Sequence, residues 1–177
     1  MTAALAAPPS VRRLMLAVSS AVVLLVAATP LAPRAAGPAD APPPFVAHTG
    51  LVNAADGIAI KGYDPVAYFT EGRPVLGDPA IRAEYDGAVW QFTTVEHRDA
   101  FLAHPTRYEP EYGGFCAYGA AQGLKTDIDP AAFSIIGGRL YLNASVDVRT
   151  RWRSELLNSI ARADRNWAEV KDQPILR

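Results

Sequence analysis

The hydrophobic pattern separates an apolar leader from the rest of the chain. An uninterrupted apolar or small stretch from Leu14 to Ala28 follows Arg12 and Arg13 and ends at Thr29-Pro30. This order of positive charge, apolar run and helix breakers is typical of a secretory signal peptide. The run has about fifteen residues, whereas a membrane-spanning helix needs roughly twenty. We therefore expect a signal peptide over residues 1–36 and no stable membrane association after its cleavage.

The leader also predicts where the protein resides. The twin arginine lacks the serine spacing and the following lysine of a twin-arginine signal, so we expect export by the Sec route. The mature protein is then periplasmic or otherwise exported. Residues 37–52 follow as a tether rich in proline and alanine, which includes Pro42-Pro43-Pro44 and His48. Such a composition favours an extended, unpacked segment.

Two hairpins are predicted in the folded part, to which we assign residues 53–173. The first runs from Ile81 to Phe92 around Asp86-Gly87, a pair that suits a turn with positive φ. The second runs from Phe133 to Leu142 around Gly137-Gly138. A short strand is expected before them at Ile58–Ile60. No internal repeat is evident in the sequence.

Two helices are predicted around these hairpins. Thr93 and Glu96 stand at the spacing of a capping box, so a short helix should begin at Thr93 and end before Pro105. Apolar residues then recur at three- and four-residue steps from Val148 to Val170, which predicts one long amphipathic helix. The expected fold class is α+β, with a small antiparallel sheet of hairpins, a short capping helix and a long C-terminal amphipathic helix.

Composition and charge exclude several functions. The 177 residues carry a formal net charge of −1, and three of the arginines precede the first acidic residue, Asp40. A mildly acidic domain with scattered arginines is not expected to bind nucleic acid. Phosphate loops, Cys-x-x-Cys pairs and serine-hydrolase elbows are absent from the sequence, so we name no catalytic residue and expect a non-enzymatic protein.

The single cysteine, Cys116, is the main candidate for chemistry. It follows two glycines in the segment from Tyr112 to Gly119, where a helical turn near Phe115 would stabilise a thiolate. Cys116 is then a metal ligand or a nucleophile; the alternative is a small buried core residue. His97 is the candidate second ligand. His104 lies seven residues further along, too far to share an ion with His97.

A group of three tyrosines and one aspartate is the second candidate. Tyr63, Asp64, Tyr112 and Tyr118 are candidates for the lining of a ligand pocket, with a place in the core as the alternative. Asp127 and Asp129 are interpreted as turn and N-cap residues before Ala131-Ala132 and not as cation ligands.

Four ordered motifs resemble the YHS domain family, in its exported, stand-alone bacterial form. They are Gly62-Tyr63-Asp64-Pro65-Val66-Ala67-Tyr68-Phe69, Trp90-Gln91-Phe92 continuing through Phe101 to Tyr108, Tyr112-Gly113-Gly114-Phe115-Cys116-Ala117-Tyr118, and Gly138-Arg139-Leu140-Tyr141-Leu142-Asn143. The resemblance covers nearly the whole folded part and implies a small α+β module associated with copper and other soft metal ions.

The resemblance also implies where a metal would bind. Metal-handling members carry three cysteines, at the positions of Ala67, Thr93 and His97 in this chain, and only His97 keeps a ligand. The implied site is therefore built around Cys116, with His97 as a partner, and binds copper or zinc. A thiol-based redox sensor using Cys116 and a structural module that binds a protein partner remain the alternatives.

Overall fold

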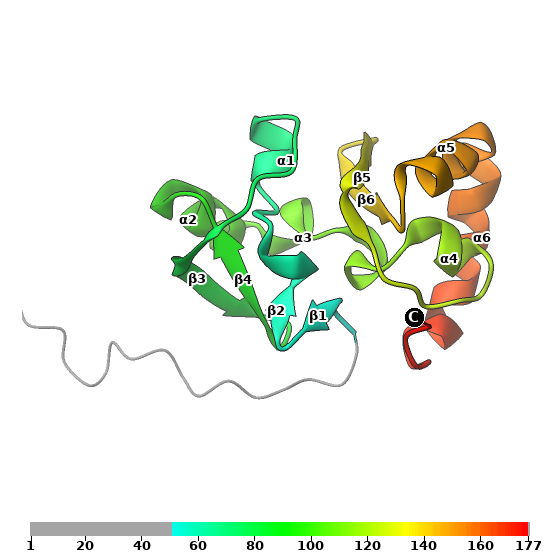
Figure 1. Ribbon diagram of the computed structural model, residues 1–177, viewed down its shortest axis with the longest axis horizontal. Coiled ribbons are helices and arrows are strands. Elements are labelled where there is room, and N and C mark those ends of the chain that lie inside the picture. Colours follow the sequence, from blue (N-terminus) through cyan, green and yellow to red (C-terminus); the bar gives the residue numbers. More distant parts are fainter. Residues whose placement is uncertain (1–50, 177) are drawn as a thin grey trace, which may run out of the picture. The chain divides into compact units, whose positions relative to one another are not determined.

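The computed structural model describes residues 51–176. The predicted signal peptide, almost all of the tether and His48 lie outside these residues. The described part mixes helices and strands, which confirms the α+β class (Figure 1). Its elements, in chain order, are β1 (Ala54–Ala55), β2 (Ile58–Ala59), the 3-10 helix η2 (Ile60–Gly62), α1 (Ala67–Thr70), β3 (Asp78–Tyr85), β4 (Ala88–Phe92), α2 (Val95–Ala103), α3 (Pro105–Tyr108), the 3-10 helix η3 (Glu111–Gly114), α4 (Ala117–Ala121), β5 (Asp129–Ile136), β6 (Arg139–Asn143), α5 (Val146–Ser154) and α6 (Leu156–Val170).

Both predicted hairpins are confirmed, but the strands belong to two sheets. One sheet has the order β1-β2-β4-β3, and the other contains β5 and β6. Strand β2 pairs with β4 in parallel, through Ile58 and Val89, so the first sheet is not purely antiparallel as we expected. The Asp86-Gly87 turn has positive φ at both residues, which explains its sequence.

The C-terminal helix is divided, contrary to the prediction of one continuous helix. Helix α5 ends at Ser154, and α6 begins at Leu156. Between them Glu155 has φ −124° and ψ 38°, outside the helical region. The N-cap expected before Ala131-Ala132 is also wrong, because Asp129 begins strand β5. Its carboxylate accepts a hydrogen bond from the Ala131 amide at 2.9 Å.

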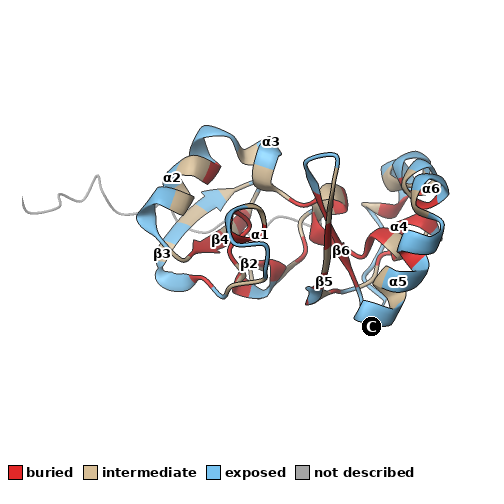
Figure 2. Cartoon of the chain, turned by 90° about the horizontal axis from the view of Figure 1, so that it is seen from above, coloured by how far each residue is buried: buried red, intermediate tan, exposed pale blue. Residues whose placement is uncertain are grey.

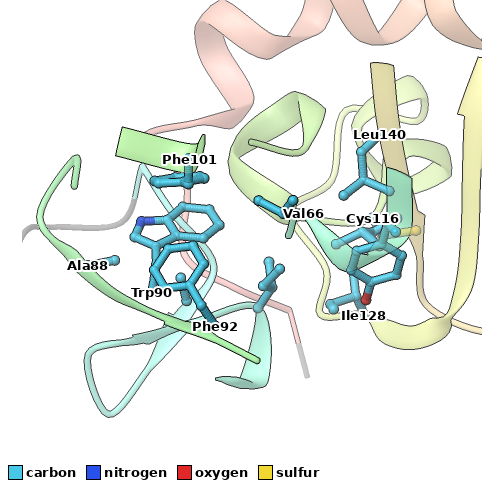
Figure 3. Close-up of a cluster of buried hydrophobic side chains, with 12 residues drawn as sticks. Val66, Ala88, Trp90, Phe92, Phe101, Cys116, Ile128 and Leu140 are labelled. Atoms are coloured by element: carbon cyan, nitrogen blue, oxygen red, sulfur yellow. The ribbon is translucent and has the colours of Figure 1, made fainter. Parts of the chain in front are cut away.

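The main core joins the two sheets. Trp90, Phe92 and Phe101 stack on one side of it, and Cys116 and Leu140 lie on the other, as Figure 3 shows. A second cluster lies beneath α6 and contains Tyr112, Ala117, Ala120, Ala121, Tyr141, Trp152 and Ala163. Exposed residues cover the outer faces of α5 and α6 (Figure 2). One face of each helix is therefore buried, as their amphipathic pattern indicates.

The two hairpins are copies of one structural unit. Strand β3 pairs with β4 in the same register as β5 with β6, and every pair recurs 51 positions later (129 − 78 = 51). Both units have an irregularity after their first pair, at Asp78 and at Asp129. A nine-residue helix follows each hairpin, capped by Thr94 in the first unit and by Ser145 in the second. The chain therefore contains an internal structural repeat.

The repeat extends to the segments that precede the hairpins. Ile60, Lys61 and Gly62 have φ values of 40°, 59° and 79°. The three residues from Tyr112 to Gly114, 52 positions later (112 − 60 = 52), have φ values of 57°, 60° and 77°. We call residues 58–108 the first repeat and residues 110–170 the second repeat. Few side chains are identical between them, which explains why the sequence does not reveal the repeat.

Candidate functional site

A fully buried carboxylate organises the first repeat. Asp64 lies directly before α1, and its side chain is inaccessible to solvent. Its Oδ1 accepts hydrogen bonds from the amides of Val66 at 2.8 Å and Ala67 at 3.3 Å. Its Oδ2 accepts from the amide of Thr93 at 2.8 Å and from the hydroxyl of Thr93 at 2.7 Å. The carboxylate thereby joins the start of α1 to the end of β4.

The imidazole of His97 completes this cluster. Its Nδ1 lies 2.6 Å from Oδ2 of Asp64, a distance typical of a strong hydrogen bond from imidazole to carboxylate. The His97 side chain is 18% exposed, so the ring lies at the edge of the protein. Its second nitrogen, Nε2, lies 3.3 Å from the hydroxyl of Thr70. Since Asp64 holds Nδ1, Nε2 is the nitrogen that can accept a proton or a metal ion.

Helix α2 positions His97 through a cap that differs from the predicted one. The capping box assigned the N-cap to Thr93, but Thr94 is the N-cap and its hydroxyl accepts from the amide of His97 at 3.1 Å. Thr93 is instead bound to Asp64. The sequence contains two successive threonines, Thr93 and Thr94. The spacing of Thr93 and Glu96 matches a capping box, but it is Thr94 that caps the helix.

The structure brings together the three positions to which the family resemblance assigns thiolates. Ala67, Thr93 and His97 all donate hydrogen bonds to the same carboxylate, that of Asp64. Ala67 offers no side-chain donor, and the Thr93 hydroxyl is engaged with Asp64. His97 is therefore the one residue of the three whose side chain could bind a metal ion strongly, with a single protein nitrogen.

Cys116 has different surroundings. Its side chain is 1% exposed, and it belongs to the main hydrophobic core (Figure 3). The sulfur accepts hydrogen bonds from the amides of Gly119 and Ala144, each at 3.3 Å. Its thiol faces Oδ1 of Asn143 at 3.8 Å. These partners share no residue with those of His97, so the structure does not bring the two predicted metal ligands to a common group.

The internal repeat explains the place of Cys116. Cys116 corresponds to Asp64, since each precedes a short helix and binds the residue that follows the second strand of its hairpin: Thr93 for Asp64, Ala144 for Cys116. The amide of Asp64 bonds to the Val75 carbonyl, as that of Cys116 bonds to the Thr126 carbonyl. The thiol thus makes the connection that the carboxylate makes in the first repeat.

The second repeat has no counterpart of the Asp64–His97 hydrogen bond. The residue at the position of His97 is Val148, which packs against the main core. An apolar side chain at this position has no ring N–H that needs a carboxylate. The thiol of Cys116 is therefore sufficient as the acceptor for the backbone amides. This equivalence is not evident from the sequence, because cysteine and aspartate are chemically different residue types.

The remaining candidates lie at separate places. Tyr63 and Tyr118 pack against the main core, which favours the structural alternative for both. The hydroxyl of Tyr112 donates to Asp164 at 2.8 Å, and its ring lines a cavity that does not include Asp64. His104 is exposed and follows the end of α2. Of the four proposed pocket residues, Tyr112 lines this cavity, and Tyr63, Asp64 and Tyr118 do not.

Comparisons with known proteins complete this description. The chain shows no significant match to protein families, curated proteins or solved structures. Within residues 51–176, no group of three or more histidine, cysteine, aspartate or glutamate side chains could hold a metal ion. No helix in the same range has the length and hydrophobicity needed to cross a membrane.

Proposed function

We propose that this chain is an exported, non-enzymatic member of the YHS family that binds a zinc or copper ion through Nε2 of His97. The hydrogen bond between His97 and the buried carboxylate of Asp64 carries the proposal. Histidines that bind metals almost always donate their other ring N–H to a carboxylate or carbonyl, which fixes the tautomer and the orientation of the ring. Asp64 has this role toward His97.

A single imidazole implies an open, exchangeable site. Stable zinc sites have three or four protein ligands, so most coordination positions here are left to water or to donor groups of a partner protein. The Thr70 hydroxyl, near Nε2, is the nearest additional oxygen. We propose a docking site for a metal ion that is shared with a partner, and not a storage site.

Cys116 is left out of the proposed site. Its sulfur is buried and already has three polar partners, none of which is an imidazole or a carboxylate. A metal ion would have to displace these partners and open the core. The proposal thus keeps one of the two predicted ligands, His97, and gives the other a structural role.

Native mass spectrometry with added Zn²⁺ tests the proposal on the mature protein. We expect one bound ion, lost in His97→Gln and retained in Cys116→Ser. His104→Gln is the matched control, because His104 is exposed and its side chain has no carboxylate partner among residues 51–176. Binding that survives His97→Gln, or that disappears in Cys116→Ser with the fold intact, would contradict the proposal.

A further inference from the structure

A cavity of about 340 Å³ opens at a place that the His97 site does not include. Its walls come from the β3–β4 turn, from η3 and from the end of α6. The charged and aromatic residues that line it are Asp86, Trp90, Glu109, Glu111, Tyr112, Trp167 and Lys171. This volume lies at the lower end of the range of small-molecule sites, about 300–1,000 Å³.

Negative charge dominates the cavity. Asp86, Glu109 and Glu111 are carboxylates, whereas Lys171 is the one cationic side chain among the lining residues. Arg139 compensates Glu111 from outside the lining, at 3.1 Å. Glu109 has a hydrogen bond with the Tyr85 hydroxyl but no cation partner within residues 51–176. Three carboxylates against the charges of Lys171 and Arg139 leave the cavity with an excess of one negative charge, which favours a cation.

The environment of Glu109 is unfavourable for its own charge. Burial raises the pKa of Glu109, and the neighbouring Asp86 carboxylate raises it further. Burial also raises the pKa of Glu111, although Arg139 opposes this shift. A partly buried, poorly compensated carboxylate destabilises the fold at neutral pH. Side chains of this kind are common at binding sites, where a ligand supplies the missing opposite charge.

Aromatic rings form another part of the wall. The rings of Tyr112 and Trp167 meet edge to face, with centroids 5.7 Å apart. The hydroxyl of Tyr112 donates a hydrogen bond to Asp164, which holds the Tyr112 ring in place. The faces of tryptophan and tyrosine attract cations, most strongly where water is excluded. Carboxylates and aromatic faces in one cavity together select an organic cation over an anion or a neutral molecule.

We propose that this cavity binds a small organic cation, an ammonium or quaternary ammonium group, between the carboxylates of Asp86 and Glu109 and the rings of Tyr112 and Trp167. The ammonium group would lie near the carboxylates, and its alkyl substituents would contact the rings. The proposal is independent of metal binding at His97, since no residue takes part in both sites.

Tryptophan fluorescence with choline as the probe tests this site, because Trp167 lines the cavity. The control ligand is the uncharged analogue of choline in which carbon replaces the quaternary nitrogen. We expect saturable quenching by choline and binding of the neutral analogue that is weaker on the order of tenfold. Equal binding of the two compounds, or no binding of choline, would overturn the proposal.

Charge-removing variants locate the site. Glu109→Gln is expected to weaken choline binding on the order of tenfold, whereas Glu169→Gln, on the exposed surface of α6, is expected to change it less than about twofold. Asp86→Asn keeps the turn, since asparagine also tolerates positive φ, and provides a second test if Glu109→Gln does not fold. His97→Gln should bind choline like the wild type. Unchanged affinity in both Glu109→Gln and Asp86→Asn would contradict the assignment.

Discussion

At the scale of single residues, Asp64 and Cys116 show how one structural position can serve two purposes. Both accept backbone amides from a short helix and from the end of a hairpin. Only the carboxylate can also hold an imidazole by a charge-assisted bond. The first repeat has Asp64 with His97, and the second has Cys116 with Val148. The first pair therefore forms a candidate binding site, whereas Cys116 only connects two backbone segments.

Truncation of Asp64 tests its role as an acceptor. Asp64→Ala leaves the buried donors of Val66, Thr93 and His97 without their partner, and each such loss costs about 1–3 kcal/mol. We expect unfolding in denaturant to show a loss of several kcal/mol. Asp99→Ala removes a carboxylate that is 60% exposed and should cost about 1 kcal/mol or less. Similar losses in the two variants would contradict this role.

The reactivity of Cys116 tests its structural role. The side chain is 1% exposed, so iodoacetamide should modify it only when the core opens. We expect slow alkylation of the native protein and rapid, complete alkylation in denaturant, measured by intact mass. Rapid alkylation of the native protein near neutral pH would instead support the thiol-based sensor.

At the scale of elements, the backbone of η3 explains the two glycines before Cys116. A Cβ atom at Gly113 would lie 1.8 Å from the carbonyl oxygen of Leu51. The residue also has φ 60°, in the left-handed region. Glycine is therefore required here for close approach as well as for conformation. The sequence predicted a sharp turn at this point, but it did not indicate that the segment before β1, at Leu51, would come close.

A pair of glycine variants separates these two requirements. Gly123 has φ 76° and open space around its Cα, so Gly123→Ala should lose about 1–2 kcal/mol through backbone strain alone. Gly113→Ala adds the clash with Leu51 and should lose clearly more, or fail to fold. Thermal unfolding by circular dichroism compares them. Equal midpoints would show that the close contact is not essential.

At the scale of the whole molecule, the sequence predicted local elements such as the hairpins better than the contacts between distant segments. The hairpins were predictable because Asp86-Gly87 and Gly137-Gly138 mark their turns. The pairing of β2 with β4, the division of the last helix and the Asp64–His97 bond depend on contacts between distant segments. Hydrophobic periodicity carries no information about such contacts. It indicates which face of an element is buried but not which other element packs against that face.

The shared core predicts that the repeats fold together. Trp90 and Phe101 of the first repeat belong to the same cluster as Leu140 and Leu142 of the second. A fragment of residues 51–108 would expose this surface to water, so we expect it to remain unfolded. Amide NMR dispersion and circular dichroism compare it with residues 51–176. A fragment that folds cooperatively by itself would show that the repeats are independent.

The pH dependence of stability tests the environment of Glu109. Its pKa is raised in the folded state, so folding favours the protonated form and stability falls as the pH rises through the acidic range. Glu109→Gln removes this penalty. We expect the variant to gain stability at pH 7 relative to the wild type and to gain little below the unfolded pKa of glutamate. Denaturant unfolding at several pH values measures the difference, and a loss of stability at pH 7 would contradict it.

NMR of the histidine ring nitrogens during a Zn²⁺ titration tests the central claim most directly. The resonances of His97 are identified with the His97→Gln variant. The account predicts that Nε2 of His97 shifts with bound zinc, while Nδ1 keeps the proton that it donates to Asp64. Unchanged His97 nitrogens at saturating zinc, or a metal ion on Nδ1 with loss of the Asp64 hydrogen bond, would contradict it.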